Sequence, residues 1–107
     1  MTKQYKFIAE HITEEDILCQ IAEEAAELAH AAMKLRRAKS GTNPTPVDSA
    51  TAIYNILEEF ADVYVARRVF QIKCTDLVAC QPIIDSITDT KTERWIKRLK
   101  EKQEATK

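Results

Sequence analysis

The chain contains a single glycine, Gly41, and only three prolines among its 107 residues. A β-sheet protein needs turn residues every several positions, so this scarcity argues against an all-β fold. Long stretches without a helix-breaking residue are instead typical of an all-α protein. The length suits one domain with a modest core. We therefore expect a single all-α domain over residues 1–107, built as a helical bundle of about four helices.

A first long helix is predicted over residues 13–38. Thr13 is a suitable N-cap, because three acidic residues follow it in the first turn, where they interact favourably with the helix dipole. No residue from there to Ala38 breaks a helix, and the alanine-rich composition favours one. The preceding residues, 1–12, are interpreted as a short polar lead-in that is poorly ordered.

The one clear loop is predicted at residues 39–47, which hold the only glycine and two of the three prolines. A second long helix follows over residues 48–72, with Thr45 or Asp48 as its cap. Consecutive helices that are joined by a short connection usually pack antiparallel. The sequence therefore predicts an antiparallel pair of long helices.

The C-terminal part of the chain, residues 75–105, is predicted to form one or two further helices. Thr75 or Asp76 can cap the first of them. Pro82 can start, kink or end a helix, because its ring fixes φ and it has no N–H group to donate. The last residues, 103–107, are expected to fray.

Two acidic pairs lie within the two long helices: Glu24 with Glu27, and Glu59 with Asp62. Each pair has i, i+3 spacing, so both carboxylates of a pair project from one helix face. When the helices pack side by side, four carboxylates converge, and they repel one another unless some are protonated or a cation lies between them. Oxygen ligands without a thiolate favour Mg²⁺, Mn²⁺ or Ca²⁺ over zinc. The pairs therefore predict a divalent-metal site inside the bundle.

The acidic pairs border apolar faces of their helices. Glu24 falls at the edge of the apolar face of the first helix, whereas Glu23 lies farther out, where water is the expected partner. The second helix has an apolar face and a separate apolar strip; the face consists of Ile53, Ile56, Leu57, Phe60, Val63 and Tyr64, and the strip of Ala61, Val65 and Val69. A helix that is apolar over so much of its circumference is buried on more than one side, which suggests a partner subunit.

The charge balance excludes some classes of partner. With 16 basic and 17 acidic residues the net charge is -1, which gives no global attraction to nucleic acid or to an anionic membrane. The three cysteines are an odd number without CxxC spacing, so they indicate neither a disulfide framework nor a thiolate zinc site. No apolar run is long enough for a membrane span or a signal peptide. The expected location is the reducing cytoplasm.

The two acidic motifs also resemble a known family. Glu-Glu-Ala-Ala-Glu-Leu (23–28) and Glu-Glu-Phe-Ala-Asp-Val (58–63) are similar to the paired ExxE and ExxD signatures of the MazG-like, all-α nucleoside triphosphate pyrophosphohydrolases. The stretches 35–46 and 91–95 resemble small phage and bacterial members. The resemblance covers most of residues 15–100.

This resemblance implies a reaction and an assembly. Family members hydrolyse nucleoside triphosphates between the α- and β-phosphates with Mg²⁺, giving a nucleoside monophosphate and pyrophosphate, and they form dimers or tetramers. It also implies that one set of residues serves as metal ligands and catalytic residues: Glu24, Glu27, Glu59 and Asp62. Mn²⁺ is a possible substitute for Mg²⁺. Acidic helices of this kind serve several related enzymes, so we expect a permissive house-cleaning activity on several (d)NTPs.

Cationic and polar side chains are candidates for binding the substrate. Lys34, Lys91 and Arg94 are candidates for contact with the phosphates, and so are Arg36, Arg37 and Arg98, although solvated surface charge is the simpler interpretation of each. Asn55, one turn before Glu59, can orient a ligand carboxylate or contact the nucleotide. Trp95 can stack on a base or serve packing alone.

Two other functions remain open from the sequence. Glu27-x-x-His30 has the spacing used by di-iron carboxylate bundles. Such sites need a second Glu-x-x-His on another helix, and the Glu59 motif is followed at position 65 by valine. A catalytically silent helical interaction module is the other alternative, and a buried carboxylate cluster without metal affinity would support it. Without a metal site, the two acidic pairs would be exposed acidic edges of their helices.

Overall fold

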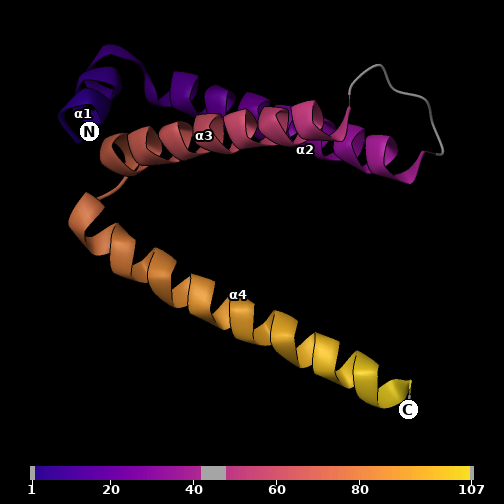
Figure 1. The fold of residues 1–107 in the computed structure, drawn as a ribbon. Helices are drawn as coiled ribbons and strands as arrows, with labels where there is room; N and C mark the ends of the chain where they lie inside the picture. The colour runs from indigo at the N-terminus through magenta and orange to yellow at the C-terminus, as the bar shows by residue number, and fades with distance from the viewer. Residues whose placement is uncertain (1, 42–47, 107) are drawn as a thin grey trace. The chain divides into compact units, whose positions relative to one another are not determined.

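The computed structural model describes residues 2–41 and 48–106. Over these residues the chain is entirely helical, without strands, which confirms the all-α prediction. Its elements, coloured from indigo to yellow in Figure 1, are α1 (Thr2–His11), α2 (Glu14–Ser40), α3 (Ser49–Cys74) and α4 (Leu77–Ala105). The chain divides into two compact units, Met1–Cys74 with α1, α2 and α3, and Thr75–Lys107 with α4. The single domain expected from the length stays a prediction.

Both ends of α2 follow from local side-chain chemistry. Thr13 forms a capping box with Asp16: the Asp16 N–H donates to Thr13 Oγ1 at 3.0 Å, and the Thr13 N–H donates to Asp16 Oδ2 at 2.9 Å. At the other end Gly41 has a left-handed conformation, with φ of 66°, and its N–H donates to the carbonyl of Arg37 at 3.1 Å. This conformation strains residues with a side chain, which explains the position of the only glycine.

Removal of the capping hydroxyl is expected to weaken the unit that contains α2. Thr13→Ala should lower the free energy of unfolding by about 1 kcal/mol, measured by urea denaturation at pH 7. The hydrogen bonds from Thr13 lower the pKa of Asp16 from its ordinary 3.8. Because this pKa is lowered, the stabilisation that ionised Asp16 gives to the fold is present above pH 3.8. It is lost as the pH falls through the pKa that Asp16 has in the folded protein. Thr13→Ala keeps the backbone N–H at position 13, which is the larger cause of the lowered pKa, and loses only the side-chain hydrogen bond. The difference in unfolding free energy between wild type and variant should therefore narrow only in part in acid, and a difference that widens would contradict this role of Asp16.

Aspartates begin the other two long helices. Asp48 Oδ1 accepts from the N–H of Thr51 at 2.8 Å, so Asp48 caps the start of α3. Asp48 is one of the two caps predicted from the sequence; the other, Thr45, lies outside the described residues. Asp76 is the N-cap of α4. The C-terminal part forms one helix, which continues through Pro82.

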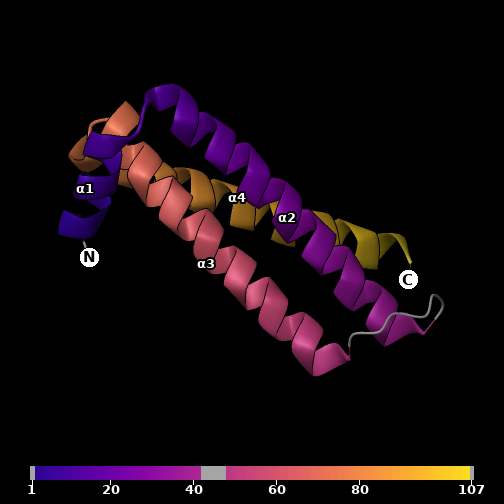
Figure 2. The same cartoon turned by 90° about the horizontal axis from the view of Figure 1, so that it is seen from above.

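Helices α2 and α3 form the predicted antiparallel pair and run side by side in both views (Figures 1 and 2). Their observed bounds, 14–40 and 49–74, agree closely with the expected 13–38 and 48–72. Because the chain reverses between them, the middle of α2 lies against the middle of α3. Both acidic pairs are in these middle sections.

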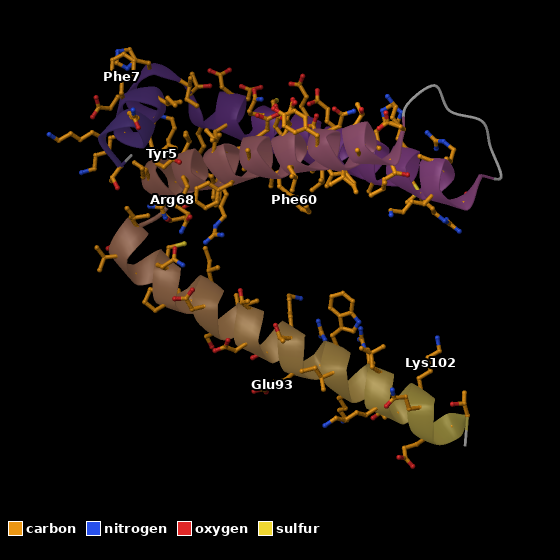
Figure 3. The ribbon with its side chains drawn as sticks, viewed as in Figure 1. Tyr5, Phe7, Phe60, Arg68, Glu93 and Lys102 are labelled. Atoms are coloured by element: carbon orange, nitrogen blue, oxygen red, sulfur yellow. The ribbon has the colours of Figure 1, made fainter. Side chains whose placement is uncertain are left out.

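Residues 2–11 form helix α1, which corrects the interpretation of residues 1–12 as a polar lead-in. Tyr5 and Ala9 lie on one face of α1 and are buried in the core, which consists of Tyr5, Ala9, Ile17, Ala66 and Val69. Lys73 Nζ on α3 donates to the carbonyl of Ala9 at 2.9 Å, and the Arg68 guanidinium lies 5.9 Å from the centre of the Tyr5 ring (Figure 3). The prediction of a lead-in rested on the polar residues of this segment and did not use the helical spacing of Tyr5 and Ala9.

The apolar residues of α3 are only partly covered within the chain. Ile56 and Val63 are half-buried, whereas four large apolar side chains at heptad-like spacing are exposed by 40–58 %: Ile53, Leu57, Phe60 and Tyr64. We call these four residues the α3 stripe; Phe60 is labelled in Figure 3. Of the separate strip, Val69 is buried in the chain's own core, and Ala61 and Val65 are exposed. In the described part of the chain, none of the helices combines the length and apolar character that a bilayer span requires.

Candidate metal centre

The antiparallel pair brings four carboxylates together. Glu24 and Glu27 come from α2, and Glu59 and Asp62 come from α3. Each offers one oxygen atom, and these four atoms all lie within 4.8 Å of one another. The convergence expected from the two i, i+3 pairs is therefore present in the structure. The role of these side chains as metal ligands stays a prediction.

Two of the carboxylates have an oxygen that is shielded from solvent and lacks a hydrogen-bond partner among the described residues: Oε2 of Glu24 and Oε2 of Glu59. Glu24 is only 9 % exposed, and its other oxygen, Oε1, accepts from Gln20 Nε2 at 2.6 Å. A shielded oxygen without a partner costs about 1–3 kcal/mol, and more when the group is charged. A cation between the carboxylates would supply the missing partner and offset the like charges. The donor set, all oxygen, fits Mg²⁺ or Mn²⁺.

Burial raises the pKa of Glu24 above its ordinary 4.5, and the charges of Glu27 and Asp62 raise it further, against a smaller lowering by the hydrogen bond from Gln20. The ionised form of Glu24 is therefore disfavoured in the metal-free fold. A nearby divalent cation acts in the opposite direction, because it favours the ionised form. Glu23, next to it in the sequence, is exposed to solvent, as its wheel position predicts.

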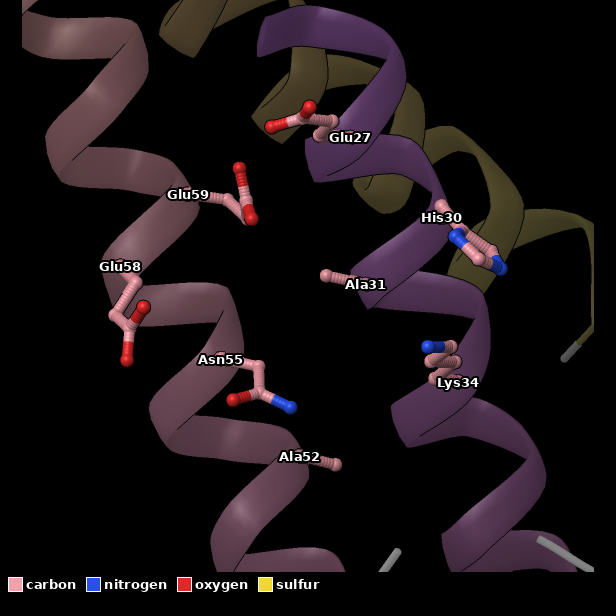
Figure 4. A pocket seen from close by; sticks show the side chains of 8 residues that line it. All are labelled: Glu27, His30, Ala31, Lys34, Ala52, Asn55, Glu58 and Glu59. Atoms are coloured by element: carbon pink, nitrogen blue, oxygen red, sulfur yellow. The ribbon is translucent and has the colours of Figure 1, made fainter.

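A polar pocket of about 180 Å³ adjoins one side of the cluster (Figure 4). The carboxylates of Glu27 and Glu59 point into the space between α2 and α3, and Lys34 and Asn55 lie farther along the same space. The pocket is lined by Glu27, His30, Ala31, Lys34, Ala52, Asn55, Glu58 and Glu59. Two of the predicted substrate-binding residues, Lys34 and Asn55, thus lie beside the carboxylates.

An apolar pocket of about 310 Å³ adjoins the other side of the cluster. Its lining combines apolar residues of α1, α2 and α3 with a few polar ones: Ile8, Ile12, Asp16, Ile17, Gln20, Glu24, Asp62, Val65, Ala66 and Val69. Sequence reasoning missed this pocket, because part of its wall comes from α1. The signal in the sequence was the i, i+3, i+4, i+7 spacing of four residues, which predicts one apolar helix face: Tyr5, Ile8, Ala9 and Ile12.

The other predicted substrate-binding residues, Lys91, Arg94 and Trp95, belong to the unit that contains α4. They share one groove on this helix with Arg98, Leu99 and Lys102. Trp95 is 70 % exposed. Glu93 and Lys102 project from opposite sides of α4 (Figure 3). Their part in binding stays a prediction.

His30 lies on the polar pocket but outside the cluster. Within residues 2–41 and 48–106, the group of side chains that can hold a metal consists of four carboxylates and includes no histidine. The Glu-x-x-His spacing of Glu27 and His30 therefore does not produce the mixed nitrogen and oxygen site that a di-iron bundle uses.

Comparison of the chain with family models, with curated proteins and with solved structures finds no match. The resemblance of the two acidic motifs to the MazG-like enzymes consequently stays a prediction. The candidate site is interpreted from its own chemistry: four carboxylates, two shielded oxygens without a partner, and one pocket on either side.

Proposed function

We propose that the protein is an Mg²⁺-dependent, MazG-like nucleoside triphosphate pyrophosphohydrolase. It would cleave (d)NTPs between the α- and β-phosphates to give the monophosphate and pyrophosphate. The observation that carries this proposal is the convergence of four carboxylates within 4.8 Å, two of which have a shielded oxygen without a partner. The paired acidic motifs of the sequence support the same reaction.

The proposed metal ligands are Glu24, Glu27, Glu59 and Asp62, with Mg²⁺ or Mn²⁺ as the cation. When bound, the cation offsets the negative charge, polarises a phosphoryl group and lowers the pKa of a water. A carboxylate that is not fully engaged as a ligand accepts the proton of the attacking water.

The two pockets suggest how a substrate would lie. Lys34 and Asn55 offer a cation and an amide in the polar pocket, which suits the phosphates. The apolar pocket suits the nucleoside. Its two polar side chains outside the cluster are already hydrogen-bonded, Gln20 to Glu24 and Asp16 to Thr13. Two polar side chains are few for reading the edge of a base, which supports a permissive activity on several (d)NTPs.

The proposal includes a homo-oligomer, either a dimer or a tetramer. Four large side chains at heptad-like spacing on one helix form an apolar seam, and a second copy of the same chain offers a matching one. We propose the α3 stripe as this interface.

A panel assay tests the reaction. With Mg²⁺, the eight common nucleotides and dUTP should yield monophosphate and pyrophosphate, identified by ion-exchange chromatography. A diphosphate product with orthophosphate would refute cleavage between the α- and β-phosphates. A preference for one nucleotide of more than about a hundredfold, roughly 2.7 kcal/mol, would refute the permissive specificity. Iron-dependent colour would indicate the di-iron alternative, and a carboxylate cluster without metal affinity would indicate a silent interaction module.

A further inference from the structure

We propose that Gln20 is a positioning residue that holds the Glu24 carboxylate in place for the cation. This inference rests on the proposed metal centre and assigns a role to a residue outside the four carboxylates. Gln20 and Glu24 are separated by one helical turn on α2, so their side chains meet on the same face. The Gln20 amide donates from Nε2 to Oε1 of Glu24 at 2.6 Å.

The hydrogen bond gives the two carboxylate oxygens of Glu24 different surroundings. Oε1 is engaged by Gln20, while Oε2 is shielded from solvent and has no partner among the described residues. With one oxygen fixed, the carboxylate cannot rotate freely, and the second oxygen keeps one orientation. Partners of this kind, which orient a ligand without touching the metal, commonly support metal sites in proteins.

The surroundings explain why a neutral amide suits this position. Gln20 lines the apolar pocket together with Ile12 and Val65, and it donates to Oε1 of Glu24, which is only 9 % exposed. A lysine here would add a cation that competes with the metal, and an acidic residue would add to the repulsion among the carboxylates. The neutral amide of Gln20 donates to Oε1 of Glu24 and leaves the net charge of the site unchanged.

Titration of the full-length protein with Mn²⁺, followed by electron paramagnetic resonance, tests this role without measuring activity. Gln20→Leu keeps the approximate volume but cannot donate, and we expect its dissociation constant for Mn²⁺ to rise by about 10-fold or more. Gln20→Met also cannot donate, adds no charge, and should likewise bind Mn²⁺ more weakly. The matched control is Gln81→Leu, because Gln81 Nε2 donates to Asp85 Oδ1 at 3.0 Å with the same spacing on α4. This control should bind Mn²⁺ as the wild type does.

The outcomes separate this inference from the proposed function. If the wild type binds Mn²⁺ and Gln20→Leu binds it equally well, the positioning role is wrong and the metal centre stands. An equal loss in Gln81→Leu would also overturn the role, since the effect would not be specific to Glu24. If the wild type itself fails to bind, the metal centre is wrong and Gln20 has no ligand to position. Circular dichroism establishes that each variant is folded, and Gln20→Met gives the result if Gln20→Leu is not.

Discussion

Glu24→Gln is expected to abolish tight binding of Mg²⁺ or Mn²⁺ and to remove the proposed hydrolysis. Glu24 combines the strongest burial in the cluster with a shielded oxygen that lacks a partner, so the amide would lose both the charge and the ligand atom. The loss should exceed the roughly 10–100-fold that is typical when only an outer partner of a metal ligand is removed. Asp62→Asn, from the other helix, should act in the same direction. Mn²⁺ titration and release of pyrophosphate measure the two effects.

The matched control is Glu23→Gln, which removes the same charge from the adjacent, exposed position and should leave both properties nearly unchanged. The metal-free protein supplies a second test. Because the pKa of Glu24 is raised, its ionised form destabilises the fold, so Glu24→Gln should raise the melting temperature at pH 7 without metal. Below about pH 4.5 Glu24 is protonated and does not destabilise the wild type. The difference in melting temperature between variant and wild type should therefore grow as the pH rises. A variant that melts lower and still binds metal would show that Glu24 is structural.

Phe60→Asp is expected to convert the proposed oligomer to a monomer. Phe60 lies in the middle of the α3 stripe and is 55 % exposed in the single chain. A carboxylate there would have to be desolvated in an apolar interface, at a cost of about 2 kcal/mol or more, which weakens association at least about 30-fold. Sedimentation equilibrium at micromolar concentration measures the change.

Leu18→Asp is the control for this second experiment. Leu18 on α2 is 50 % exposed, close to the value for Phe60, but it lies outside the α3 stripe. Its substitution should leave the oligomer intact. A wild type that sediments as a monomer would contradict the oligomer, and equal dissociation by both variants would show that the stripe is not the interface.

Most of the helical architecture follows from local signals. Thr13 and Gly41 mark the ends of α2 through a capping box and a left-handed residue, and both depend on neighbours within four positions. The shared direction of the two carboxylates in each acidic pair is also a local property, because side chains at i and i+3 lie on the same face of any helix. Antiparallel packing then needs only a short connection. The sequence therefore predicted the long helices and the convergence of the carboxylates.

What the sequence did not reveal depends on tertiary contacts. Helix α1 is stabilised by burial of Tyr5 and Ala9 against α3 and by the contact of Lys73 with the carbonyl of Ala9, all of which connect distant parts of the chain. The apolar pocket was missed for the same reason. On α3, periodicity identified the apolar positions but could not distinguish Val69, in the core, from Phe60, which is exposed.

The separation of α2 and α3 beside the carboxylates depends on two small residues. Ala31 and Ala52 face the polar pocket from opposite helices (Figure 4), and they are 9 % and 1 % exposed. The distance between packed helices follows the size of the side chains at their contact. Mg²⁺ requires oxygens at about 2.0–2.1 Å, whereas Ca²⁺ accepts about 2.3–2.6 Å. At the proposed centre, the two alanine methyl groups therefore influence which ion fits between the helices. Bulkier side chains at these positions would spread the helices and favour the larger ion, although every ligand stays the same.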